Sequence, residues 1–410
     1  MQSASPRPSV FYPPPIFRRA THWLGQPTPL ALAEPVPTYH GSGPVWSASS
    51  LALRDALAAP LMSRPRAGYD RSFVDRYRPN ETFLLPPALI EELSGLSRIT
   101  DQQPAGTYMR RVLEELLVDL SWSSSYLEGN AYTRMDTVQL FQRTEETHEP
   151  DAIMLLNHKR AIEFMVEAVP LCGLTPQLLR NLHGLLMADL LANPQALGAV
   201  RHQVVHINGT SYDPCQVPSL LDEMFEQIVL KASLILEPIE AAFFLWVHLA
   251  YLQCFEDGNK RLSRLAANVP LMLYNQAPLS FMDVTREDYV LAMIGVYERQ
   301  DLSMATELFD WTYRRSLPKY RLLLETMSRP DPFRMQHRRA LETAVVQVVR
   351  ARASLARAVD QAGVAAAHRD RFLSLLLTEL QHLGSHNCAR FRLTPGEIEA
   401  WVGAGRPPSP

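Results

Sequence analysis

Cysteine is scarce in this sequence. The 410 residues contain only Cys172, Cys215, Cys254 and Cys388. No two of them stand close enough along the chain for a zinc knuckle or a redox pair. This scarcity argues against a disulfide scaffold and favours reduced thiols in a cytoplasmic protein.

The chain also lacks a long apolar run and a strong excess of charge. Its longest apolar stretch, 241–255, contains His248 and Gln253 and is too short to span a bilayer. The N-terminal residues show no apolar run after a basic start, so we expect no signal peptide. A formal net charge of −3 gives no general attraction to nucleic acid or to anionic membranes. We therefore expect a cytoplasmic protein with no membrane partner.

Proline is concentrated at one end of the chain. Ten of the 32 prolines fall within the first 44 residues. Proline lacks an amide donor and clashes with the preceding helical turn, so this region cannot form long helices. We predict an extended or loosely packed arm over 1–80, which Trp23, Trp46 and Tyr69 pin to a surface. Disorder of the arm is the alternative.

Helical periodicity begins near residue 83 and dominates the rest of the chain. The pattern predicts helices over 106–130, 152–168, 175–191, 218–234, 237–253, 258–274, 286–298 and 302–316. The stretch 200–214 differs, because Val204, Val205 and Ile207 favour a strand and Asn208–Gly209 is a strong turn signal. The predicted fold class is therefore all-α, with a helical domain over 81–328 and a small β-hairpin at 200–214.

The last part of the chain, 329–410, reads as a separate helical region. An arginine-rich helix is predicted over 338–359, a second over 367–383, and a short one after Thr394–Pro395. The arginines form no clear recognition-helix pattern, so a DNA-binding regulator is the weakest of the functional hypotheses and we expect no nucleic-acid partner.

The segment from Gln253 to Arg264 lies between two predicted helices and carries the strongest chemical signal. A loop that leads into a helix N-terminus presents free amide donors and a positive dipole end. Gly258 lets the backbone approach a ligand closely, and Arg261 and Arg264 share one face of the first turns. Two cations at this end of a helix are unfavourable unless an anion neutralises them. The alternative is an ordinary loop whose arginines meet surface carboxylates.

This segment resembles the signature of the Fic family, His-x-Phe-x-Asp/Glu-Gly-Asn-Gly-Arg-x-x-Arg. The positions that match are Phe255, Asp257, Gly258, Asn259, Arg261 and Arg264. Two positions depart from it, because Gln253 stands where the family has histidine and Lys260 where it has the second glycine. The likeness continues over residues 107–316, and Asn157–His158 resembles part of the family's core.

The resemblance implies a helical fold that binds ATP and Mg²⁺. Asp257 would hold the magnesium ion, and Asn259 with the loop amides around Gly258 would hold the α- and β-phosphates. Arg261 would hold the β-phosphate side and Arg264 the γ-phosphate. A side chain at position 260, in a crowded part of the cradle, would either add a phosphate contact or narrow the pocket.

A second motif resembles the family's inhibitory pattern, Ser/Thr-x-x-x-Glu-Gly/Asn. It consists of Ser124, Glu128 and Gly129 on a helix upstream of the signature. In the family this glutamate pairs with the second arginine of the signature, here Arg264, and occupies the place of the γ-phosphate. The segment after Gly198 resembles the family's flap, so the resemblance implies that an unidentified target protein binds at 200–214 by strand addition.

The residue at position 253 leaves the transfer reaction without the general base that the family uses. In active members of the family the histidine takes a proton from the target hydroxyl, whereas the neutral amide of Gln253 has no useful basicity. Of the other candidates, His248 is expected to be a packed core residue, Glu256 to point to solvent, and His206 to lie on the flap.

Three hypotheses follow. The first is transfer of AMP from ATP to a protein hydroxyl, autoinhibited by Glu128 and impaired by Gln253. The second is a catalytically inactive nucleotide-binding protein. The third is a hydrolase that removes AMP from a modified protein, with Glu128 activating water.

Overall fold

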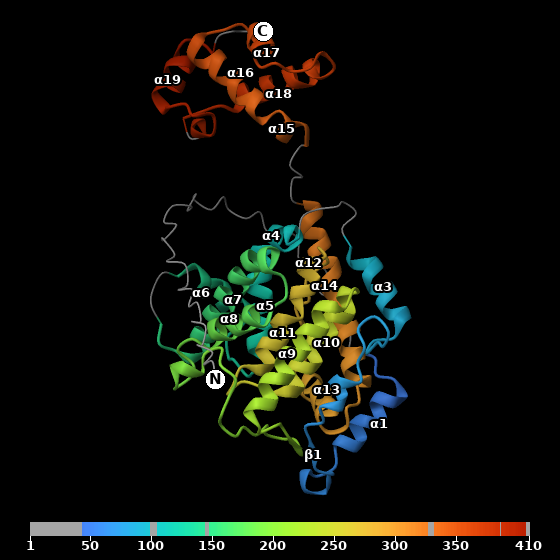
Figure 1. Ribbon diagram of the computed structural model, residues 1–410. Coiled ribbons are helices and arrows are strands. Elements are labelled where there is room, and N and C mark those ends of the chain that lie inside the picture. Colours follow the sequence, from blue (N-terminus) through green and yellow to red (C-terminus); the bar gives the residue numbers. More distant parts are fainter. Residues whose placement is uncertain (1–42, 99–104, 144–146, 327–331, 386, 407–410) are drawn as a thin grey trace, which may run out of the picture.

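The computed structural model describes residues 43–98, 105–143, 147–326, 332–385 and 387–406 (Figure 1). As predicted, the fold is all-α, with two short strands among the described residues. The first half contains α1 (Ala48–Leu57), η1 (Leu61–Ser63), β1 (Ala67–Gly68), α2 (Ser72–Asp75), α3 (Pro87–Ser97), α4 (Thr107–Arg111), α5 (Leu113–Leu127), α6 (Arg134–Gln142), α7 (Pro150–Cys172), α8 (Pro176–Met187), η2 (Pro194–Ala196) and β2 (Tyr212–Asp213). Then follow α9 (Pro218–Leu234), α10 (Pro238–Leu252), α11 (Asn259–Ala266), α12 (Asn268–Leu273), α13 (Arg286–Arg299) and α14 (Ser303–Thr326). In the described part of the chain, every helix falls short of the length and apolar content needed to cross a membrane.

Helix α10 lies at the centre of the main body (Figure 1). All of its residues are buried, and it contacts α3, α9, α11, α12 and α13. A helix that is apolar on every side has to be surrounded in this way. Pro238 occupies its first turn, where a missing amide hydrogen costs nothing. Because α10 is fixed on all sides, the loop that follows Leu252 starts from a rigid position.

The region before residue 81 differs from the predicted loose arm. Its described part, 43–80, contributes four side chains to the main core: Leu53, Leu57, Val74 and Tyr77. Trp46 and Tyr69 pack against the same core, while Trp23 lies outside the described residues. Positions 45–59 contain no proline, so helix α1 can form there and bury its apolar face. The prediction of a loose arm extended the proline-rich character of the first 44 residues to a segment that has none.

The predicted hairpin at 200–214 is replaced by a different arrangement. The turn at Asn208–Gly209 is present, but β2 pairs in parallel with β1 from the N-terminal region. The side-chain amide of Gln216 accepts a hydrogen bond from the N–H of Val205 (3.3 Å) and donates one to its carbonyl oxygen (2.9 Å). A side chain thus satisfies the backbone groups that a second hairpin strand would have paired.

Three segments predicted as single helices are each divided in two. The first divides between α4 and α5 at Val112. The second divides between α11 and α12, where Pro270 cannot donate to the carbonyl oxygen of Ala266. The third divides at Arg352, which has a φ of +52° and ends helix α16. Apolar residues recur at helical spacing on both sides of each break, so periodicity alone does not reveal the breaks.

The C-terminal helices have a hydrophobic core of their own. They are α15 (Pro332–Gln336), α16 (Arg338–Ala351), α17 (Leu355–Gln361), η3 (Ala366–His368), α18 (Arg369–His382), η4 (Cys388–Phe391) and α19 (Pro395–Gly403). Their buried apolar residues, among them Phe372, Leu376 and Trp401, form a cluster that shares no member with the main core. As predicted, Thr394 caps the last helix, with its side chain accepting from the N–H of Glu397. The domain boundaries at 80 and 328 remain a prediction.

Candidate functional site

The loop between α10 and α11 turns sharply at both ends. Gln253 ends α10 with a φ of +53°, and Gly258 begins α11 with a φ of +76°. A Cβ at position 258 would lie 2.6 Å from the Sδ of Met187, so only glycine fits there. The side chain of Asn259 closes the loop, because it accepts from the N–H of Phe255 (2.9 Å) and donates to its carbonyl oxygen (2.8 Å). Asn259 therefore shapes the loop from within.

His183 on α8 supports the same loop, and sequence reasoning missed it. Its Nε2 lies 2.9 Å from the carbonyl oxygen of Asp257, and its Nδ1 accepts from the N–H of Gly198 at 2.9 Å. The ring is therefore neutral with its proton on Nε2, and burial lowers its pKa to about 4. It also stacks on Phe255 with 3.9 Å between ring centroids. The signal that could have found it is a histidine inside the apolar stripe of the predicted 175–191 helix.

Arg201 connects this loop to the stretch 200–214. Its side chain is buried and donates to the carbonyl oxygens of Gln253 (2.7 Å), Gln203 (2.8 Å) and Cys215, and to the Oε1 of Gln216 (2.8 Å). One guanidinium thus fixes the backbone of position 253 relative to the predicted flap.

Arg264 is the most enclosed cation of the site, with no exposed surface. Its Nε donates to the Oγ of Ser124 (3.0 Å), its Nη1 to the Oη of Tyr289 (2.9 Å), and its Nη2 to the carbonyl oxygen of Ser124 (2.9 Å). The same Nη2 forms an ion pair with Glu128 at 2.7 Å. The contact between Glu128 and Arg264 expected from the resemblance is therefore present.

Lys260 makes a second ion pair with the same carboxylate. Its Nζ lies 3.0 Å from the Oε2 of Glu128, so the two oxygens of Glu128 meet two different cations. Burial opposes ionisation of this carboxyl, but the charges of Arg264 and Lys260 outweigh burial and hold its pKa at about 2. The departure at position 260 thus adds a contact to Glu128 in this conformation. We refer to Glu128, Lys260 and Arg264 as the carboxylate clamp.

Gly129 follows the clamp with a φ of +98°. A Cβ at this position would lie 3.0 Å from the Nη1 of Arg286. Glycine is therefore required both by the backbone conformation and by the close approach of this guanidinium.

Ser124 is oriented from its other side by His158 on α7. The Nε2 of His158 lies 3.0 Å from the Oγ of Ser124, and its Nδ1 lies 3.0 Å from the carbonyl oxygen of Met154. Since Ser124 accepts from Arg264, its own hydroxyl hydrogen is free to point to Nε2. Burial, and then the charge of Arg261, lower the pKa of His158 to about 3, so the ring is neutral.

Arg261 is buried but only partly paired. Its Nη2 contacts the Oδ2 of Asp257 at 3.2 Å, whereas its Nη1 has no hydrogen-bond partner among the described residues. The Asp257 side chain is 70% exposed. A buried guanidinium nitrogen without an acceptor is unfavourable, and the N-terminus of α11 beside it favours an anion. The arrangement is therefore suited to an anionic ligand.

The residues present also fit a magnesium ion bound together with phosphate. No group of three or more His, Cys, Asp or Glu side chains in the described ranges could enclose a metal ion. Mg²⁺ commonly takes only one or two protein carboxylates and completes its shell with water and phosphate oxygens. The exposed carboxylate of Asp257 meets that requirement and would bring the ion's charge next to the bound phosphates.

No base is found at position 253. The Nε2 of Gln253 donates to the carbonyl oxygen of Ala250 at 2.6 Å, so the amide turns back to its own helix. His248 is fully buried between Phe73 and Phe244, as expected for a packed histidine.

The other two candidates lie nearer the surface. The side chain of His206 is 71% exposed and lies 3.5 Å from the carboxylate of Asp213. Glu256 is half-buried, and the prediction that it points to solvent is met only in part.

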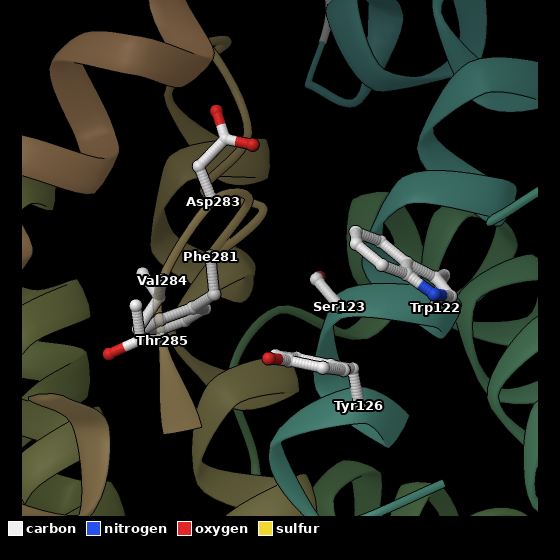
Figure 2. A pocket seen from close by; sticks show the side chains of 7 residues that line it. All are labelled: Trp122, Ser123, Tyr126, Phe281, Asp283, Val284 and Thr285. Carbon is white, nitrogen blue, oxygen red and sulfur yellow. The ribbon is translucent and has the colours of Figure 1, made fainter. Parts of the chain in front are cut away.

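A separate hollow of about 230 Å³ lies between α5 and the segment that precedes α13. Figure 2 shows Trp122 and Tyr126 of α5 facing the chain segment that leads into α13. The residues that line it are Trp122, Ser123, Tyr126, Phe281, Asp283, Val284 and Thr285. None of them belongs to the signature, so this hollow is distinct from the loop and the clamp.

Residues 173–271 match the model of the Fic/DOC family. This segment runs from the end of α7 into α12 and carries the loop, Lys260 and both arginines of the signature. It does not include Ser124 or Glu128. A comparison with curated proteins found no match.

Several solved structures are similar to this chain. A segment of Fic-1 from C. elegans has 18% identity and a TM-score of 0.44, covering 67% of this chain and 73% of that one. A Fic domain containing signaling protein from Bacteroides thetaiotaomicron has 19% identity and a TM-score of 0.46, covering 59% and 97%. A Fic family protein from Desulfovibrio desulfuricans has 18% identity and a TM-score of 0.46, covering 74% and 92%.

Proposed function

We propose that this protein is a Fic-type nucleotide-binding protein that transfers AMP from ATP to a protein hydroxyl at a low rate. The observation that carries the proposal is the partly paired Arg261 at the N-terminus of α11, next to an Arg264 that is held by Glu128. The family match over 173–271 supports it, because that segment contains both arginines.

The proposed reaction gives each residue of the loop a defined part. The oxygen of the target hydroxyl attacks the α-phosphorus, the bond to the β-phosphate oxygen breaks, and pyrophosphate leaves. Asp257 would hold the magnesium ion, Arg261 the β-phosphate and Arg264 the γ-phosphate, while Gly258 and Asn259 keep the loop open to phosphate. The target would lie along 200–214.

The hydroxyl proton has no acceptor at position 253, so it passes to solvent water. A general base normally contributes about 10²–10⁴-fold to the rate. We propose that Gln253 leaves nucleotide binding intact and removes that contribution to the rate. The protein should therefore bind MgATP well and transfer AMP slowly.

The carboxylate clamp is the proposed means of autoinhibition. While Glu128 pairs with Arg264 and Lys260, neither cation is available to the γ-phosphate. Loss of Glu128 would leave two adjacent cations without a counter-ion, and a triphosphate supplies one. Lys260 therefore strengthens the clamp when Glu128 is bound and adds a phosphate contact when it is not.

Calorimetric titration with ATP and Mg²⁺ tests the proposal. We expect Glu128→Gly to bind MgATP roughly 10- to 100-fold more tightly than the wild type, since hydrogen bonds to charged groups contribute about 1.5–3 kcal/mol. Glu114→Gly is the matched control, because Glu114 is exposed on the same helix and should leave the affinity unchanged. Absence of MgATP binding by Glu128→Gly, with the fold intact, contradicts the proposal.

A binding function without transfer is the second candidate, and one observation favours it. The side-chain amide of Gln253 donates to the carbonyl oxygen of Ala250 in its own helix, so it is not directed toward a target hydroxyl. Labelled AMP on any protein, dependent on Mg²⁺ and on Arg264, separates the two candidates.

Removal of AMP by a hydrolase is less well supported. A carboxylate with a pKa of about 2 is a poor base for water while the clamp is closed.

A further inference from the structure

Two buried hydrogen-bond donors near the clamp lack a partner among the described residues. One is the Nη1 of Arg261 and the other is the hydroxyl of Tyr297 on α13. Buried polar groups in proteins are nearly always satisfied, so each exception calls for an explanation such as strain or a ligand. Arg261 belongs to the phosphate cradle already described, whereas Tyr297 matches no position of either motif.

The surroundings of Tyr297 place its hydroxyl at the site. The side chain is 3% exposed, and its ring stacks on Tyr212 of β2 with 5.4 Å between centroids and a 17° angle between planes. The charges that act on its hydroxyl include Glu128 and Arg264, and the side-chain amide of Gln253 comes close enough to influence its pKa, without reaching normal hydrogen-bond geometry. Tyr297 therefore lies beside β2 and position 253, within range of the charges of the clamp.

Comparison with a neighbouring tyrosine on the same helix sharpens the point. The hydroxyl of Tyr289 accepts from Arg264 at 2.9 Å and from the Nε1 of Trp246 at 3.3 Å. The oxygen of that hydroxyl therefore accepts two hydrogen bonds, one of which holds Arg264. The Tyr297 hydroxyl, by contrast, makes no hydrogen bond of normal geometry with any described residue.

The chemistry of this hydroxyl is that of a donor. Burial raises the pKa of Tyr297 well above its ordinary value, so the group keeps its proton. It cannot replace the missing base of position 253. It can donate one hydrogen bond to a ligand oxygen that comes within reach.

We propose that Tyr297 is a nucleotide-binding residue whose hydroxyl donates to an oxygen of the sugar–phosphate part of the bound nucleotide. This inference rests on the proposed function, because it assigns a further contact to the same site. The hydroxyl without a partner in the free protein gains one when the nucleotide binds.

Replacement by phenylalanine tests this in a way that separates binding from stability. In the Glu128→Gly background, Tyr297→Phe should weaken MgATP binding about tenfold in calorimetry, the effect of one lost hydrogen bond. The same change should leave the thermal midpoint unchanged or raise it, because it removes an unsatisfied buried hydroxyl.

Tyr313→Phe is the matched control. Tyr313 is also fully buried, but its hydroxyl donates to the carbonyl oxygen of Ala277 at 2.8 Å. This variant should lower the thermal midpoint and leave MgATP affinity unchanged, the reverse of Tyr297→Phe.

The possible outcomes are distinguishable. Unchanged affinity in Tyr297→Phe, while Glu128→Gly still binds MgATP, overturns the role of Tyr297 and leaves the proposed function in place. A lowered thermal midpoint in Tyr297→Phe also overturns it, because the hydroxyl would then have a structural partner. Failure of Glu128→Gly itself to bind MgATP overturns both.

Discussion

Gln253→His together with Lys260→Gly is expected to raise the rate of AMP transfer by about 10²–10⁴-fold, when both are made in the Glu128→Gly background. Histidine restores a proton acceptor at the place where the target hydroxyl reacts. The backbone permits the change, because position 253 has a φ of +53° and histidine is among the residues that tolerate the left-handed region. Lys260→Gly is included because it restores the glycine that the signature has at this position, so that both departures from the signature are reverted together.

The measurement is labelled AMP on the protein itself or on a lysate target. Gln253→Leu in the same background is the control, because leucine can neither accept a proton nor hold a hydroxyl. If the Glu128→Gly protein already transfers AMP at a rate that histidine does not improve, a base outside the motif must exist, and His206 is the first candidate. If the histidine variant binds MgATP but transfers no labelled AMP, the binding function without transfer is favoured.

Acid is expected to unfold the main body steeply. His158, His183 and His248 are buried and neutral, and burial lowers their pKa values to about 3, 4 and 3. In the unfolded chain a histidine pKa is about 6.5, so the unfolded state binds more protons below that pH. The free energy of unfolding is therefore highest above pH 6.5 and falls as the pH falls toward the folded values.

The expected size of this effect is large. Because the unfolded histidines are half protonated at pH 6.5 and almost fully protonated at pH 5, the slope should grow from about 2 kcal/mol per pH unit at pH 6.5 to about 4 kcal/mol per pH unit near pH 5. Typical domain stabilities are about 5–15 kcal/mol, so the loss over this interval is a large part of the total. The measurement is urea unfolding at several pH values.

His248→Leu isolates one of the three histidines. Both ring nitrogens of His248 lack a hydrogen-bond partner in the described part of the protein, so leucine should fit between Phe73 and Phe244 without loss. The variant should reduce the pH slope by about a third, whereas His202→Leu at an exposed position should leave it unchanged. An unaltered slope in His248→Leu shows that this histidine is protonated in the folded protein.

The fold and the main contacts of the site could be predicted where they depend on local pattern or on a motif. Apolar spacing gave the helices, and the two motifs paired Glu128 with Arg264 although they are 136 positions apart in the sequence. The contact of Lys260 with Glu128 could not be predicted, since it depends on how α5 and α11 approach each other. The support of the loop by His183 was missed for the same reason, because both of its partners come from other parts of the chain.

Other differences arose from competition between local and long-range interactions. Asn208–Gly209 does form a turn, but the backbone after it pairs with β1, and Gln216 satisfies Val205 in place of a strand. No local signal identifies a partner that lies about 145 residues away along the chain. The proline-rich start likewise suggested a loose arm, whereas residues 43–80 join the main core.

The most direct test of the central claim is the discrimination between ATP and ADP by the wild type and Glu128→Gly. The claim is that Glu128 occupies the place of the γ-phosphate on Arg264 and Lys260. Removing it should therefore strengthen ATP binding roughly 10- to 100-fold and change ADP binding far less, with Mg²⁺ present in both calorimetric titrations. An equal gain for both nucleotides, or no gain for either, would contradict the account.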